Sequence, residues 1–441
     1  MSLIGLMKVV ANTEFSFQKL IVYSVIVSGL LGTAFFNIDL GLFSLSPYRL
    51  VLLCAAMYMV MQIRNINFYR FAHVHLSILF LCLWLCFSLS GVMWSFDKLL
   101  AFKNVVYIFF NLLTVIVLVY FLQTTELIYL VLKCWLFIYV LFAFFAIYEV
   151  FSGSHLANSM LNGLPPEMSY LQFVPTVTFG NQNDYATFMT LSLPFISIVA
   201  LNTDLKYFKW GLTFIYLISL PILFATTSRA NYLGLFVSFT ISFLFFTNLR
   251  SKFAVILLVV FLVGGTYLLL PTDLLEQFWV YVETFQGITA FNVDEDLSLE
   301  VRWNLVYNSF YFFITSFGLG VGPGNLEAYN KFKSPTFTDG IINSHNWWFE
   351  IMANYGILIF ALYVLMYLWI LYTLFTIRFQ ASNKKTKVVS EFLLAGFLTF
   401  IVSSSSPSSV IAFIPQWIFL GIALSFINVY KRDSSLASAV A

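Results

Sequence analysis

Long apolar runs separated by short polar segments dominate this chain. A helix needs about 20 predominantly apolar residues to cross the hydrocarbon core of a bilayer. Runs that meet this requirement recur from the N-terminal region to the C-terminal region and predict twelve membrane-spanning helices. The predicted helices are centred near residues 20–36, 48–63, 74–94, 102–122, 127–150, 184–201, 209–227, 230–248, 253–270, 346–376, 391–405 and 409–429, with boundaries that extend by several residues.

One long polar insertion, residues 271–345, interrupts this alternation between the ninth and tenth predicted helices. It predicts three parts: helices one to nine in residues 1–270, an insertion subdomain in 271–345, and helices ten to twelve in 346–441. The first apolar run follows polar sequence and precedes many further runs. We therefore expect a first membrane helix here and not a cleaved signal peptide.

The composition agrees with a polytopic membrane protein. Hydrophobic residues make up 61% of the 441 residues, charged residues 10%, and the mean hydropathy is +0.90. A soluble globule of this size has too little interior to bury so much apolar surface. The formal net charge of +2 gives no support for binding nucleic acid. The four cysteines lie inside apolar runs, which is typical of small core residues and not of a disulfide framework or a metal site.

The distribution of basic residues predicts the orientation of the helices. If the N-terminus is cytoplasmic, the inside segments hold fourteen of the 22 lysines and arginines, as the positive-inside rule requires. The insertion shows the reverse balance, with nine acidic and three basic residues between Pro271 and His345. We therefore expect both termini in the cytoplasm and the insertion on the outer face of the membrane.

Three residues on the expected outer face are candidates for chemistry. His345 ends the insertion and has an imidazole, which can accept a proton near neutral pH. Taken alone, such a histidine is more often structural. Arg229, in a short turn, and Arg302, in the insertion, run against the positive-inside rule and can hold a phosphate through two parallel hydrogen bonds.

Several polar elements also have a simple structural interpretation. Asn183 or Asp184 is expected to cap the sixth predicted helix. Ser403–Ser409 is expected to be a plain external turn. The glycine-rich run Phe317–Asn325 lacks the Lys-Ser/Thr and the strand–helix context of a nucleotide-binding loop, so its glycines favour a tight turn or close approach to a ligand. Trp347 and Trp348 are expected in the interfacial aromatic belt in preference to stacking on sugars.

Four separated motifs follow one another along the chain. They are Ser228-Arg229-Ala230, Arg302 in a large external loop, Phe317–Asn325, and His345–Glu350 with Asn354-Tyr355-Gly356. In this order they resemble the O-antigen ligase and O-antigen/teichuronic acid polymerase superfamily, and the resemblance covers most of the sequence. Phe179–Asp184 is also similar to the asparagine-rich element that these proteins carry before their sixth helix.

The resemblance implies an all-α, GT-C-like membrane fold and an inverting glycosyltransferase. Its donor would be an undecaprenyl-diphosphate-linked oligosaccharide on the outer face of the bacterial cytoplasmic membrane, and its acceptor another glycan. No nucleotide sugar, cofactor or metal is implied. A chain-length regulator and a flippase are the implied partners, alongside membrane lipid.

The residue chemistry fits this activity. A diphosphate leaving group gains negative charge as the glycosidic bond breaks, so Arg229 and Arg302 are predicted to bind it, and His345 is predicted to accept the proton of the acceptor hydroxyl. The possible further substrate contacts are Asn181, Asn183, Asn346, Trp303, Gly322 and Gly324.

Two other functions stay open. A transporter or flippase would place ionisable residues in mid-membrane and show two related halves, whereas the predicted spans are nearly free of charge apart from Lys133 and Glu149. A ligase that transfers glycan to a lipid A core shares the fold and the donor with a polymerase. The asparagine-rich element favours a capsular, teichuronic or exopolysaccharide polymerase.

Overall fold

The computed structural model describes residues 17–32, 38–39, 41, 44–61, 68–164, 171–241, 243 and 295–440, and these are helical apart from turns and one small antiparallel sheet. The sheet pairs β1 (Ile38–Asp39) with β2 (Ser44–Leu45). The α-helices are α2 (Phe17–Leu31), α3 (Pro47–Met61), α4 (His75–Gly91), α5 (Lys98–Phe121), α6 (Thr125–Ser152), α7 (Gln182–Asn202), α8 (Lys206–Ala225), α9 (Arg229–Ile241), α12 (Glu295–Thr315), α13 (Asn325–Lys333), α14 (Trp347–Gln380), α15 (Lys384–Ser403) and α16 (Ile414–Val440).

The predicted all-α membrane fold is confirmed. Every predicted helix except 253–270 overlaps an observed one, although the last two differ in bounds: the sequence predicts 391–405 where α15 spans Lys384–Ser403, and 409–429 where α16 spans Ile414–Val440. The predicted helix 253–270 lies outside the described residues, as does 271–294 of the insertion. Six described helices are long and apolar enough to cross a membrane, and α2, α3 and α4 are shorter apolar helices. The total of twelve stays a prediction. The described part of the insertion is itself helical and supplies α12 and α13.

Short polar side chains start several of these helices at the positions where the chain turns. Asp97 caps α5 by accepting a hydrogen bond from the Leu100 amide at 2.9 Å, and Thr124 caps α6 in the same way. Such caps satisfy amides that have no partner inside the helix. At the other end of α6, Gly153 adopts the left-handed conformation that ends the helix.

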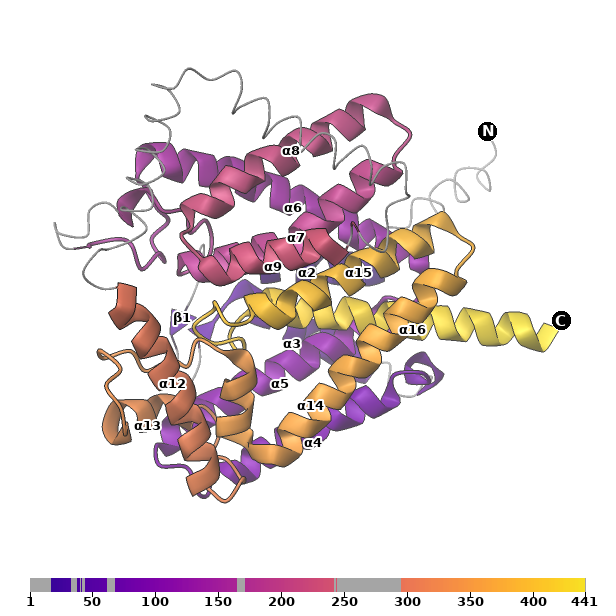
Figure 1. The fold of residues 1–441 in the computed structure, drawn as a ribbon. Helices are drawn as coiled ribbons and strands as arrows, with labels where there is room; N and C mark the ends of the chain where they lie inside the picture. The colour runs from indigo at the N-terminus through magenta and orange to yellow at the C-terminus, as the bar shows by residue number, and fades with distance from the viewer. Residues whose placement is uncertain are drawn as a thin grey trace, which may run out of the picture.

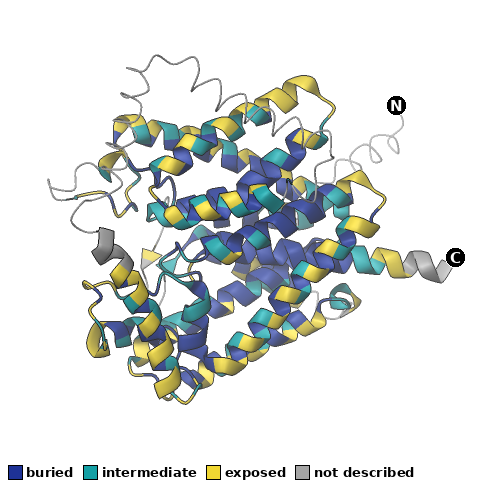
Figure 2. Ribbon diagram, in the orientation of Figure 1, coloured by how far each residue is buried: buried dark blue, intermediate teal, exposed yellow. Residues whose placement is uncertain are grey.

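The core lies where the helices from the two halves of the sequence meet. Helix α16 packs along α5, α15 packs against α7 and α9, and α14 packs against α15 and α12. Figure 2 shows the buried residues along the middle of the bundle and the exposed ones on its outer faces. Trp84 and Trp135 are fully buried in this core. Exposed apolar side chains on the outer helices fit contact with lipid.

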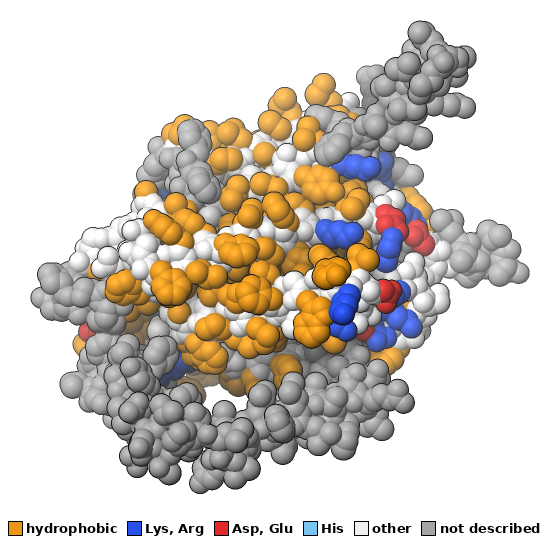
Figure 3. Space-filling view, turned by 90° about the horizontal axis from the view of Figure 1, so that it is seen from above, with side chains coloured by type: hydrophobic (Ala, Val, Ile, Leu, Met, Phe, Trp, Pro, Cys, Tyr) orange, Lys and Arg blue, Asp and Glu red, His pale blue; other side chains and the backbone are white. Residues whose placement is uncertain are grey.

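The elements at the two ends of the bundle differ. Helices α12 and α13 lie at one end, here called the α12 end, and the C-terminal part of α16 lies at the other (Figure 1). In Figure 3 a broad apolar surface gives way to lysines, arginines and carboxylates at one end of the visible face. Ion pairs join the turns at that charged end: Lys385 to Glu126 at 2.7 Å and Lys384 to Asp204 at 3.6 Å.

Candidate active site

The serine-rich turn between α15 and α16, residues Ser403–Ser409 and here called the serine turn, connects three other segments at the α12 end. The Ser406 hydroxyl lies 2.6 Å from the Ser228 hydroxyl and donates to the Asn183 side-chain oxygen at 3.1 Å. Its carbonyl oxygen lies 3.3 Å from Nδ1 of His345. The interpretation of this segment as a plain turn is therefore wrong, because Ser406 joins the starts of α7, α9 and α14.

His345 is held in a conformation that leaves one ring nitrogen available. Its φ of 46° is in the left-handed region, which few residues other than glycine adopt. A carbonyl oxygen only accepts hydrogen bonds, so Nδ1 donates to Ser406 and carries the proton in the neutral ring. The lone pair is then on Nε2, which is the nitrogen able to accept a proton.

The surroundings of His345 also favour the neutral imidazole. Burial lowers its pKa most, the hydrogen bond to the Ser406 carbonyl opposes that shift, and the positive charge of Arg302 lowers the pKa further. Because the net shift is downward from the ordinary value, the ring is neutral at pH 7. The His345 side chain is half-buried, and the neutral imidazole is the form that a general base requires.

The two predicted arginines share this region. Arg229 is the first residue of α9 and Arg302 lies in the N-terminal half of α12, and both side chains are exposed. Burial of part of the Arg302 side chain, together with the positive charge of Arg229, lowers the pKa of Arg302. The charge of Arg229 thus lowers the pKa of Arg302, and the charge of Arg302 lowers the pKa of His345. Clustered positive charge of this kind attracts anions, and a bound anion offsets the repulsion between the two guanidinium groups.

Two asparagines of the asparagine-rich segment, Asn181 and Asn183, have different hydrogen-bond partners. Asn181 caps the helix by accepting from the Asp184 amide at 2.9 Å, so the prediction that Asn183 or Asp184 is the cap is wrong by a few positions. The Asn183 side chain is left to accept from Ser406. Of the two asparagines, Asn183 therefore belongs to the network around His345.

A buried asparagine that the sequence did not single out connects α9 to α7. Asn231 donates to the Ser228 hydroxyl at 2.9 Å and to Thr187 at 3.3 Å, and its oxygen accepts from Thr190 at 3.0 Å. Its side chain is fully buried. It lies two residues after Arg229, so the polar character of Ser228–Asn231 was the available sequence signal. Asn231 fixes the start of α9, from which Arg229 projects.

Asn346 and Trp347, which follow His345, make contacts at the start of α14. Asn346 caps α14, accepting from the amides of Trp348 and Phe349. Trp347 is 1% exposed, donates to the Tyr363 hydroxyl at 3.0 Å and packs near Trp84. The prediction that Trp347 belongs to the interfacial belt is therefore wrong, because this side chain faces the core. Trp303 on α12, in contrast, is 72% exposed and accessible to a ligand.

The glycine-rich turn Phe317–Asn325, here called the glycine turn, is packed on both sides. An added Cβ would lie 2.0 Å from the Ser95 hydroxyl oxygen at Gly322 and 1.8 Å from the Asn104 side-chain nitrogen at Gly324, and both glycines have positive φ. The Gly322 amide donates to the Asn354 carbonyl at 3.0 Å. Close packing against α4, α5 and α14 accounts for these two glycines.

Two glutamates, Glu350 and Glu327, lie near the serine turn and near each other. Ser409, in the serine turn, donates to the buried side chain of Glu350 at 2.6 Å. Burial raises the pKa of Glu327 on α13. Within the part of the chain that the structure describes, no three His, Cys, Asp or Glu side chains are grouped closely enough to hold a metal ion. The hydrogen-bond partners described above around His345 are hydroxyls, side-chain amides and a backbone carbonyl.

Comparison with known proteins adds two findings. The sequence model of a protein family described as O-Antigen ligase matches residues 214–364, a stretch that contains Arg229, Arg302 and His345 but not the serine turn. The chain is also 29% identical to the teichuronic acid biosynthesis protein TuaE of Bacillus subtilis (strain 168), over 98% of this chain and 90% of that protein.

Proposed function

We infer that this chain, which belongs to the O-antigen ligase and polymerase superfamily, assembles a polysaccharide from a lipid-linked donor. It is a multi-pass membrane protein of polysaccharide biosynthesis. We assign to it a polyprenyl-diphosphate-linked glycan, specifically an undecaprenyl-diphosphate oligosaccharide, as donor and a second glycan as acceptor. The observation that carries this proposal is the shared location of Arg229, Arg302 and His345, which come from three separate segments.

The proposed reaction is a single displacement at the anomeric carbon. The acceptor oxygen attacks the face opposite the diphosphate and forms the new glycosidic bond, while the bond to the phosphate oxygen breaks and its electron pair leaves with the diphosphate. Nε2 of His345 takes the acceptor hydroxyl proton. Arg229 and Arg302 stabilise the charge that grows on the diphosphate. One displacement inverts the anomeric configuration, and none of these steps requires a metal ion.

The same proposal places the reaction on the outer face of the bacterial cytoplasmic membrane, with both termini in the cytoplasm. The charged end carries the ion pairs of Lys384 and Lys385, and the positive-inside rule favours such an end in the cytoplasm. The α12 end then faces outward, where a flipped donor arrives. A flippase supplies that donor, and a chain-length regulator is the expected partner of a polymerase.

Of the two acceptor classes, we propose polymerisation of repeat units. The relative that matches along nearly the whole chain has a name that refers to teichuronic acid biosynthesis, and teichuronic acid is itself a polysaccharide. The asparagine-rich element Phe179–Asp184, which Asn183 connects to the serine turn, also favours this class. Transfer to a different acceptor defines the ligase alternative.

The experiment that tests this function uses the purified full chain in liposomes with a synthetic undecaprenyl-diphosphate oligosaccharide. A polymerase yields a ladder of lipid-linked products, whereas a ligase yields product only when a separate acceptor is added. His345→Ala should abolish both, and His75→Ala is the matched control because that exposed histidine lies at the charged end. No product from folded wild-type protein under either condition would refute the proposal.

A further inference from the structure

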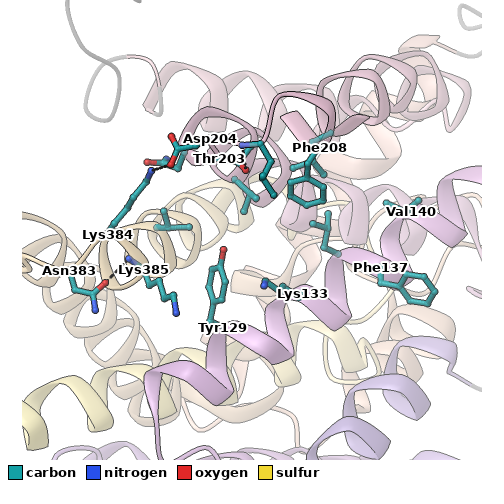
Figure 4. Close-up of a pocket in the computed structure, with 16 residues that line it drawn as sticks. Tyr129, Lys133, Phe137, Val140, Thr203, Asp204, Phe208, Asn383, Lys384 and Lys385 are labelled. Atoms are coloured by element: carbon teal, nitrogen blue, oxygen red, sulfur yellow. Dashed lines mark hydrogen bonds and ion pairs between the residues drawn. The ribbon is translucent and has the colours of Figure 1, made fainter. Parts of the chain in front are cut away.

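A large cavity lies at the charged end, far from the candidate active site. Its volume is about 1000 Å³, and it is bounded by α6, the turn from α7 into α8, α8 and the start of α15. Figure 4 shows Tyr129, Lys133 and Phe137 along α6, with Asp204 and Phe208 on the opposite side of the cavity and Lys384 and Lys385 at the rim. Most of the wall is apolar: Leu136, Phe137, Val140, Val199, Phe208 and Leu212.

The three lysines at this cavity differ in their partners. Lys384 lies 3.6 Å from Asp204, and Lys385 lies 2.7 Å from Glu126. Lys133 lies 4.9 Å from the centre of the Tyr129 ring, and among the described residues no carboxylate forms an ion pair with it. The cavity therefore has one positive charge in excess.

The depth of Lys133 makes this charge unusual. It lies eight residues after Thr125, the first residue of α6, which corresponds to roughly 12 Å along the helix axis. Charged groups within a membrane span are costly, and they are typically paired or mark a binding site. A lysine can also extend its ammonium group towards the membrane surface along its own apolar stem. The Lys133 side chain is exposed, and the open cavity beside it gives an anion a place to meet it.

We propose that this cavity binds an anionic membrane phospholipid. The phosphate lies against Lys133, and an acyl chain follows the wall formed by Phe137, Val140 and Leu212. One phosphodiester carries one negative charge, which balances the one excess positive charge. The volume is at the upper end of the range of about 300–1,000 Å³ for ligand pockets, as a lipid chain with its headgroup requires. This site does not depend on the proposed glycosyl transfer.

Binding is tested on the purified full chain in neutral detergent. Native mass spectrometry and thermal unfolding are measured with phosphatidylglycerol, with phosphatidylcholine of the same acyl chains, and with glycerol 3-phosphate. We expect phosphatidylglycerol alone to bind and to raise the melting temperature, because ligand binding to the folded state stabilises it. Equal binding of phosphatidylcholine would overturn the role of charge. An equal shift with glycerol 3-phosphate would overturn the role of the lipid chain.

Four variants connect the binding to this cavity. Lys133→Gln should weaken phosphatidylglycerol binding roughly tenfold or more, because it removes a charge-assisted contact, while Lys133→Arg should retain binding. Lys209→Gln, the control, removes an exposed charge at the start of α8 that does not line the cavity, and should bind as the wild type does.

Val140→Trp fills the apolar part of the cavity without changing its charge, and should also lose the lipid. Wild-type lipid binding by folded Lys133→Gln, or by folded Val140→Trp, would refute the assignment to this cavity. If Lys133→Gln is unstable, Val140→Trp and Lys133→Arg still decide the question. Equal loss in Lys133→Gln and Lys209→Gln would show general attraction to a basic surface and would also refute it.

Discussion

The glycine turn and the serine turn lie at the same end of the molecule and are both made of small residues, but they serve different purposes. The glycine turn is fixed by its own backbone, which approaches α4 and α5 so closely that a methyl group does not fit at Gly322. The serine turn is fixed by its side chains and carbonyls, which reach Asn183, Ser228, His345 and Glu350. Small residues therefore provide close packing in one turn and hydrogen-bonding groups in the other.

This difference separates stability from activity. A side chain added to the glycine turn collides with neighbouring helices and should act on the free energy of unfolding. A hydroxyl removed from the serine turn leaves the packing intact and should act on the geometry of His345 and its neighbours. The following predictions test this distinction, beginning with the residue that the serine turn positions.

The largest effect is expected at His345. His345→Ala removes the proposed base and should lower the transfer rate by about a hundredfold to ten-thousandfold, while the binding of the lipid-linked donor is retained because the arginines hold the diphosphate. Donor binding and product formation are measured on the same preparation. Full product yield would refute the role as base, and loss of donor binding together with yield would indicate a structural histidine.

The next largest effect is expected at the arginines. Arg229→Ala or Arg302→Ala should reduce transfer by about a hundredfold to a thousandfold, the usual cost of removing one group that stabilises developing charge. Lysine should rescue only in part, because a single ammonium cannot reproduce the two-pronged contact of a guanidinium. Lys331→Ala, an exposed cation at the same end, is the control. Wild-type turnover in either alanine variant would remove that arginine from the site.

In the glycine turn, Gly322→Ala should lower stability by about 1–3 kcal/mol, the range typical of overpacking. Gly340→Ala is a matched control, because Gly340 also has positive φ (72°) but has no atom within 4 Å of an added Cβ. Gly340→Ala should therefore lower stability by less than Gly322→Ala does. Thermal unfolding measures both, and Ser95→Ala should relieve part of the Gly322→Ala effect by removing the colliding oxygen. Equal destabilisation by the two glycine variants would show that only φ matters.

The pH dependence should reveal the electrostatic effect of Arg302 on His345. The neutral imidazole is the active form, so transfer should fall as the pH drops below the pKa of His345, which lies below the ordinary value of about 6.5. Arg302→Ala removes a positive charge that lowers this pKa, so the pKa of His345 should rise. The residual activity should then fall at a higher pH than the wild-type activity does. The pH–rate profiles of the two proteins provide the measurement. An unchanged midpoint would mean that Arg302 does not act on His345.

Sequence patterns identified the charged residues of the site more readily than the neutral ones. Arg229 and Arg302 stood out because positive charge on the outer side of a membrane protein is unusual, and His345 stood out because an imidazole can accept a proton near neutral pH. Ser406 carried no such signal, since its importance comes from the distant segments that fold against it. Trp347 was misplaced because an apolar helix does not show in its sequence which side faces protein and which faces lipid. The membrane helices could be predicted because the length of an apolar run can be read from each segment of the sequence by itself.

The smallest expected effect distinguishes Ser406 from its neighbour. Ser406→Ala removes the hydroxyl that joins Asn183 and Ser228 but keeps the carbonyl that holds His345. One lost hydrogen bond costs about 0.5–1.5 kcal/mol, so transfer should fall about twofold to tenfold with little change in stability. Ser405→Ala is the control, because the Ser405 hydroxyl only donates to the carbonyl of Val402 in the preceding turn. If the two variants lose activity equally, the serine turn is a plain turn after all, and its difference from the glycine turn disappears.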